Sequence, residues 1–164
     1  MKPENLLQPI YFARPSSQVA QDIIGKTLIL PKGERFTIVE TGAFEGLTES
    51  KRPALADFTK LPGQIYAHFA CGTYSLAINT DKQTIPSVIT IRGIAPVDNL
   101  ETMLGAKKIA EKLEIDKSMN DMIVNHSTPF FITNDNTNVN YRIVANKPKT
   151  AAENVVSFYY LKRI

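Results

Sequence analysis

The segment Ser87–Arg92, which reads Ser-Val-Ile-Thr-Ile-Arg, constrains the fold more than any other part of the sequence. Its residues are almost continuously apolar or β-branched, a pattern typical of a strand that is buried on both faces. A strand of this kind lies in the interior of a sheet. The sequence therefore predicts a β-sheet with Ser87–Arg92 near its centre.

Further strand patterns lie on both sides of this segment and are separated by turn signals. Lys26–Leu30 and Arg35–Thr41 flank a Pro-Lys-Gly-Glu turn and predict an antiparallel hairpin. Gln64–Ala70 and Thr73–Asn79 flank a Cys-Gly pair and predict a second hairpin. More strands are expected at Phe130–Ile132, Tyr141–Val144 and Val155–Leu161.

Two stretches have helical spacing. Ser16 or Ser17 can cap a short first helix, which we expect to end near Ile24 with Gly25 in the left-handed stop position. A second helical stretch is expected over Leu100–Leu113, after a capping Asp98 or Asn99, with Gly105 as a place where it can split into two short helices. Strands in runs, with helices between them, indicate the α+β class with a mostly antiparallel sheet.

Length and composition limit the organisation of the chain. Its 164 residues suit one domain, 1–164, and the polar stretch Glu45–Pro62 is expected to form a long loop. Cys71 is the sole cysteine, which excludes an intramolecular disulfide and a zinc site built from cysteines. No apolar run approaches the ~20 residues that cross a bilayer. The N-terminus leads into no signal-like apolar core, so a cytoplasmic protein is expected.

The charge balance is mildly basic. Lys and Arg number 19 against 16 Asp and Glu, which gives a net charge of +3. This balance permits a polyanionic partner without demanding one. Basic residues that could contact phosphates, if they share one face, are Lys51, Arg52, Lys60, Lys147, Lys149, Lys162 and Arg163.

Four blocks of sequence, taken in order, carry a family resemblance. They are Phe12–Pro15 (Phe-Ala-Arg-Pro), Ile38–Phe44 (Ile-Val-Glu-Thr-Gly-Ala-Phe), Pro62–Tyr66 (Pro-Gly-Gln-Ile-Tyr) and Val88–Arg92. Together they resemble the alkyladenine (3-methyladenine) DNA glycosylase family, and weaker echoes extend to Ser157-Phe158-Tyr159. The resemblance therefore covers most of the chain.

The resemblance implies a curved, mostly antiparallel sheet with short peripheral helices. It also implies a partner, double-stranded DNA that carries a damaged purine. Members of the family flip the purine into a pocket and hydrolyse its N-glycosidic bond, in base excision repair of alkylation damage. No metal or cofactor is implied, nor an obligate protein partner, and a monomer is expected. A bacterial member is expected near the nucleoid.

The family's site residues can be carried over one at a time. The catalytic glutamate of the family aligns with Gly42, which has no side chain to act as a base. The pocket aromatic two residues later is Phe44, a second pocket tyrosine aligns with His68, and the family arginine is retained as Arg92. The resemblance thus assigns Gly42, Phe44 and His68 to a base pocket and Arg92 to catalysis.

Three further positions complete this assignment. The wedge residue that enters the vacated base stack aligns with Cys71. The pocket asparagine aligns with Ile78, and Asn79 is adjacent. Because residues two apart in a strand share a face, Glu40 is a candidate catalytic carboxylate near Gly42, and a buried structural carboxylate is the alternative.

Three functions remain open at this point. The first is an alkylpurine DNA glycosylase with a displaced or weakened catalytic apparatus. The second is a glycosylase-like protein that binds altered DNA or a nucleobase-like ligand without chemistry, as the glycine at position 42 suggests. The third is a scaffold that has lost both activities and binds another protein.

Overall fold

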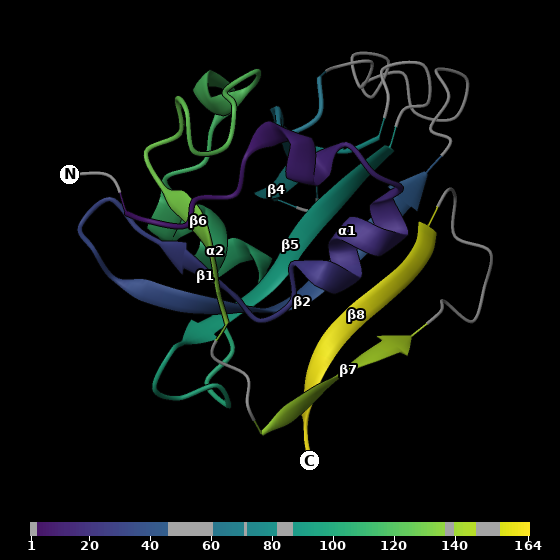
Figure 1. Cartoon of the computed structure of the whole chain (residues 1–164). Coiled ribbons are helices and arrows are strands. Elements are labelled where there is room, and N and C mark those ends of the chain that lie inside the picture. Colours follow the sequence, from purple (N-terminus) through teal and green to yellow (C-terminus); the bar gives the residue numbers. More distant parts are fainter. Residues whose placement is uncertain (1–2, 46–60, 71, 82–86, 137–139, 147–154) are drawn as a thin grey trace.

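The computed structural model describes residues 3–45, 61–70, 72–81, 87–136, 140–146 and 155–164 (Figure 1). Most of the predicted loop Glu45–Pro62 lies outside these ranges. The helical elements are η1 (Pro9–Phe12), α1 (Ser16–Asp22), α2 (Ala106–Leu113) and η3 (Lys117–Met119). The strands are β1 (Lys26–Ile29), β2 (Arg35–Glu45), β3 (Ile65–Ala70), β4 (Thr73–Asn79), β5 (Ser87–Pro96), β6 (Phe131–Asn136), β7 (Tyr141–Asn146) and β8 (Val155–Arg163).

The eight strands form one sheet in which every pairing is antiparallel. The main order is β3-β4-β5-β2-β1-β6, and β8 joins β2 to β7. Strand β5, which contains Ser87–Arg92, lies between β4 and β2, so its predicted central place is confirmed. Both predicted hairpins are confirmed as β1–β2 and β3–β4, and so is the α+β class.

Strand β2 pairs with three other strands. Strand β5 runs along the whole of one edge, from Phe36 to Glu45. The other edge is shared, with β1 beside the first half and β8 beside Glu40 to Phe44. The register of β2 with β5 is irregular on both sides of Glu40, near the place where the neighbour on the other edge changes from β1 to β8.

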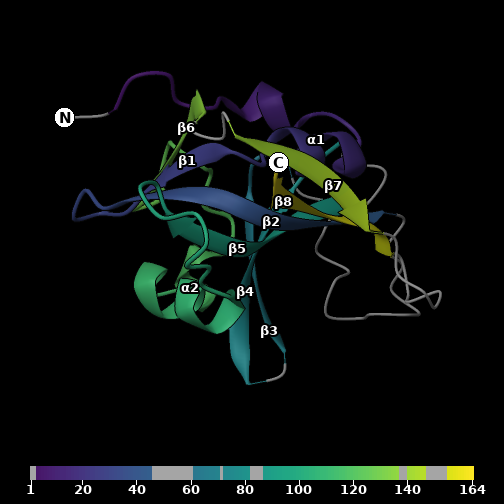
Figure 2. The ribbon, with the colours of Figure 1, turned by 90° about the horizontal axis from the view of Figure 1, so that it is seen from below.

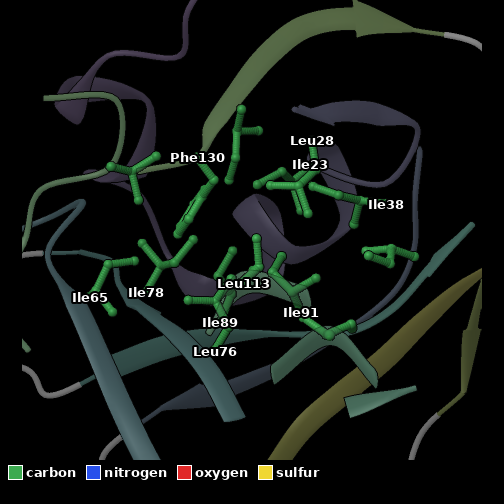
Figure 3. Close-up of a cluster of buried hydrophobic side chains, with 14 of the residues drawn as sticks. Ile23, Leu28, Ile38, Ile65, Leu76, Ile78, Ile89, Ile91, Leu113 and Phe130 are labelled. Atoms are coloured by element: carbon green, nitrogen blue, oxygen red, sulfur yellow. The ribbon is translucent and has the colours of Figure 1, made fainter. Parts of the chain in front are cut away.

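The main hydrophobic core lies between the sheet and the two α-helices (Figure 3). Helix α1 contributes Val19, with Ile23 at its C-cap, and α2 contributes Ile109 and Leu113. Helix α1 has seven residues, too few for a stable isolated helix, so packing on β2 holds it. Figure 2 shows the β3–β4 hairpin extending away from β2 and β5. Within the described residues, no helix is long and apolar enough to cross a membrane.

The second helix is shorter than predicted. It begins at Ala106 rather than near Leu100, and the residues before Gly105 form turns instead. The physical reason is a bridge between Ile94 and Leu104, which exchange two backbone hydrogen bonds of 3.1 and 2.7 Å. Those backbone groups are therefore unavailable to a helix. After the first helix, Gly25 has the predicted positive φ, at 92°.

A buried asparagine ties the N-terminal segment to β6. The Nδ2 atom of Asn125 donates to the carbonyls of Leu7, at 2.7 Å, and Ile132, at 2.8 Å. Its Oδ1 atom accepts from the Ile132 amide at 2.8 Å. The side chain is 3% exposed and the residue has a φ of 70°, which asparagine tolerates better than most residues. One amide thus satisfies three buried backbone groups.

Asn125→Ala should destabilise the fold strongly. The substitution removes the side-chain partner of the Leu7 carbonyl and of the Ile132 amide, whereas the Ile132 carbonyl keeps its bond from the Leu7 amide at 3.0 Å. It also keeps a positive φ at a residue that resists it. We expect the free energy of unfolding to fall by roughly 3 kcal/mol in urea denaturation. The exposed Asn99→Ala is the matched control and should change it by less than about 0.5 kcal/mol. Equal effects of the two substitutions would contradict this role.

Candidate functional site

Cross-strand register brings Gly42 to the middle of a row that crosses the sheet. Gly42 in β2 lies opposite Thr90 in β5 on one side and Phe158 in β8 on the other. Directly opposite residues of an antiparallel pair point to the same face. We call the face of β2, β5 and β8 that carries Gly42, Thr90 and Phe158 the Gly42 face. The row continues through Ala77 to Tyr66.

The Gly42 face is the side of β2 that turns away from α1. The residues on either side of Gly42, Thr41 and Ala43, are buried, and Ala43 belongs to the main core. The Thr41 hydroxyl donates to the carbonyl of Ala20 in α1 at 2.7 Å. Because alternate strand residues point to opposite faces, Gly42 faces away from this contact.

Arg92, Glu40 and Phe158 meet beside Gly42. The Nε atom of Arg92 lies 3.3 Å from Oε1 of Glu40. The guanidinium carbon of Arg92 also lies 4.1 Å from the centre of the Phe158 ring, a cation–π contact. The Arg92 side chain is 42% exposed and the Glu40 side chain 27%. The sheet therefore holds a cation and a carboxylate in fixed positions that solvent reaches.

The space above Gly42 is already taken by its neighbours. A Cβ atom added at Gly42 would lie 2.9 Å from Oγ1 of Thr90 and 3.2 Å from two ring carbons of Phe158. Real Cβ contacts are rarely so short, so a larger side chain here requires the neighbours to move. The Thr90 hydroxyl is buried and finds no hydrogen-bond partner among the described residues. Position 42 is therefore surrounded by the Thr90 hydroxyl and the Phe158 ring, and it carries no acidic group itself.

Aromatic rings line the face on both sides of Gly42. Phe44 stands edge-on to Phe158, with 6.5 Å between the ring centres. Phe44 and Tyr66 are half-buried and pack against Ala77 and Val88, which form a small second core on this side of the sheet. Three half-buried rings, from β3, β2 and β8, thus form an aromatic wall.

The two residues proposed for the pocket in β4 point to opposite faces. Ile78 lies opposite Ile89, and both are buried in the main core, away from Gly42. Asn79 lies opposite Val88 on the side of Phe44, without any bulge in β4. Its Nδ2 atom donates to the Gln64 carbonyl at 3.0 Å, whereas its buried Oδ1 has no partner among the residues described. The structure therefore joins Asn79, and not Ile78, to the aromatic side.

The remaining predicted positions lie in the β3–β4 hairpin. His68 lies in β3 opposite Ser75, two residues after Tyr66, and so at a backbone position that belongs to the Gly42 face. Its side chain is outside the described part of the structure. Cys71 also lies outside the described residues. Gly72, which follows it, has the positive φ of a tight turn, at 80°.

Two residues of this face, Thr90 and Phe158, were not singled out from the sequence. Phe158 falls within the weak Ser-Phe-Tyr echo near the C-terminus, but that echo carries no site role. Alternation along β8 shows that Phe158 and Tyr160 share a face, yet it does not show which strand β8 joins. Only the pairing with β2 brings Phe158 to Gly42.

Gly42→Ala should destabilise the protein because the added methyl group meets Thr90 and Phe158. We expect the free energy of unfolding to fall by about 1–3 kcal/mol. Gly105→Ala is the matched control, because a Cβ there meets nothing within 4 Å. Thr90→Ala should partly rescue Gly42→Ala in a double-mutant cycle followed by urea denaturation. Equal effects at Gly42 and Gly105 would show that the space is open.

Comparisons with known proteins show the family of this chain. The family model described as methylpurine-DNA glycosylase (MPG) matches residues 10–150. A protein of Wolbachia pipientis wMel, provisionally named a 3-methyladenine DNA glycosylase, is 30% identical over 139 residues, 77% of this chain and 76% of its own. The DNA-3-methyladenine glycosylase of Rattus norvegicus is 27% identical over 127 residues, 70% of this chain and 40% of its own.

Other relatives are matched over a smaller share of their length. A provisionally named 3-methyladenine DNA glycosylase of Alkaliphilus oremlandii is 31% identical over 109 residues, 59% of this chain and 54% of its own. The chain thus spans about half the length of that relative. The family match nevertheless includes β1 to β7 and the core that supports the Gly42 face. This chain therefore belongs to the methylpurine-DNA glycosylase family.

Proposed function

We propose that this protein is a 3-methyladenine-type DNA glycosylase, which binds duplex DNA and releases an alkylated purine. The observation that carries the proposal is the family match over residues 10–150, which includes Gly42 and Arg92. An enzyme that acts on a base must first take it out of the helix, because its reactive bond is inaccessible in the stack. We propose a cytoplasmic location, at the nucleoid in a bacterium, and we expect the protein to act as a monomer.

The aromatic wall supports the binding of a flipped base. Unstacked bases are recognised by stacking on aromatic rings and on the planes of arginine guanidinium groups. Phe44, Phe158 and Tyr66 provide the rings, and Arg92 provides an exposed guanidinium held against Phe158. We assign His68 and Asn79 to the same pocket, and Cys71 to the tip of the hairpin that approaches the vacated stack.

The charge of the substrate makes a weak catalytic apparatus sufficient. Alkylation at a ring nitrogen gives the purine a positive charge, and the electron pair of the breaking N-glycosidic bond neutralises it. The base therefore leaves without being protonated first. The oxygen of a water molecule forms the new bond to the sugar carbon, and its proton passes to a carboxylate. We assign this last role to Glu40, which the Arg92 contact holds beside Gly42.

A second candidate function is recognition of altered DNA without chemistry. The observation that favours it is the glycine at position 42, whose neighbours Thr90 and Phe158 fill the space that a catalytic side chain needs. In this case the aromatic wall and Arg92 bind the flipped base, and another protein completes repair.

Base release separates the two candidates. Duplex DNA with a single 7-methylguanine is incubated with the protein, and abasic sites are detected by strand cleavage in alkali. A glycosylase should release 7-methylguanine faster than the neutral base hypoxanthine. Only the methylated base carries a positive charge in DNA, and that charge is neutralised as the bond breaks. Binding of both duplexes without abasic sites would instead select recognition without chemistry.

Glu40→Gln should abolish release while preserving the fold and the binding of DNA. The amide keeps the shape of the side chain but cannot accept the proton of water, so we expect a loss of about 100-fold or more. Glu34→Gln is the matched control, because Glu34 is another carboxylate of β-hairpin β1–β2 in an ion pair, with Lys112 at 3.9 Å. Single-turnover release by Glu40→Gln at the wild-type rate would remove Glu40 from the mechanism.

A further inference from the structure

Strands β7 and β8 place two cations directly opposite each other. Arg142 and Lys162 are a register pair, and both side chains are exposed. Like charges at directly opposite positions of an antiparallel pair destabilise it. Within the described ranges, neither cation forms an ion pair. No ion pair with a described residue therefore offsets the electrostatic cost of this pair.

Nearby cations are neutralised, which makes this pair stand out. Arg163, the next residue of β8, lies 2.9 Å from Glu101, and Arg92 lies 3.3 Å from Glu40. On the same face, Val144 follows Arg142 by two residues and Tyr160 precedes Lys162 by two. These two neighbours lie opposite each other and carry no acid. An anion that is not part of this ribbon is the simplest partner for the two cations.

The pair lies on the same face as the aromatic wall. Tyr160 lies opposite Glu40, and Phe158 lies opposite Gly42, so even-numbered residues of β8 point to the Gly42 face. The register of β7 with β8 has no irregularity, so Lys162 lies on the same face as Phe158 and Tyr160. Lys162 lies four residues along the strand from Phe158, a distance of about 13 Å. Figure 1 shows the β7–β8 ribbon at the margin of the sheet, beside β2.

We propose that Arg142 and Lys162 bind the phosphate backbone of duplex DNA, beside the nucleotide whose flipped base binds at the Gly42 face. This inference rests on the proposed function. A distance of about 13 Å corresponds to about four steps of 3.4 Å along one DNA strand, so the same duplex can reach both places. Phosphates supply the anion that the pair lacks, and such contacts set the position of the protein on DNA without reading its sequence. A duplex fits better than a membrane surface, because the pair is continuous with a base-binding wall.

The test is the salt dependence of DNA binding, measured by fluorescence anisotropy with the full chain and a lesion-containing duplex. Each phosphate contact contributes about 0.9 to the slope of log K against log salt. The double variant Arg142→Ala with Lys162→Ala should therefore lose about 1.8 from the slope and bind more weakly at low salt. The matched control, Lys32→Ala with Arg35→Ala, removes two exposed cations at the distant β1–β2 turn and should leave the slope unchanged.

A single variant separates a binding role from a structural one. Arg142→Glu sets a carboxylate opposite Lys162, so the melting temperature should stay the same or rise while DNA affinity falls. If the wild-type chain binds DNA and the double variant keeps its slope, this inference is overturned and the proposed function stands. If the wild-type chain binds no DNA at low salt, the proposed function fails, and this inference fails with it. Loss of binding to anionic lipid vesicles, with DNA binding unchanged, would assign the pair to a membrane surface and overturn the proposal.

Discussion

The pairing of β2 with three strands is the constraint on which the rest of the structure depends. Strand β5 covers one edge of β2, and β1 and β8 share the other. One side of β2 is buried under α1, and the other side is the Gly42 face. The same eleven residues therefore hold the hydrophobic core together and present the candidate site. A change in their register would move both at once, because a slip of one residue exchanges the two faces.

This constraint explains the character of the site. With β5 and β8 on either side, position 42 has Thr90 and Phe158 as immediate neighbours, and their close approach suits glycine. The face gains an aromatic wall and a cation held by stacking, and its carboxylate lies two residues away at Glu40. The chemistry that we propose for this face depends more on the leaving tendency of the substrate than on a strong base. For that reason the proposed substrate is a cationic purine rather than a neutral one.

Local patterns predicted much of the fold, and they failed where distant backbone groups compete. The two hairpins and the central place of Ser87–Arg92 follow from alternation and turn residues, which act over a few residues. The helix predicted from Leu100 begins only at Ala106, because Leu104 bonds to Ile94 instead. Strand β6 extends to Asn136, beyond the predicted Ile132, because β1 offers it a partner. In each case a tertiary contact outweighed local propensity.

The sequence by itself determined the class of fold, the family resemblance and the residues at the positions that the resemblance aligns, including Gly42. The tertiary structure decided which of these residues meet. It set Phe158 beside Gly42, turned Asn79 rather than Ile78 toward Phe44, and set Arg142 opposite Lys162. The physical reason is that alternation fixes the faces within one strand. Pairing and register between distant strands depend on the packing of the whole sheet.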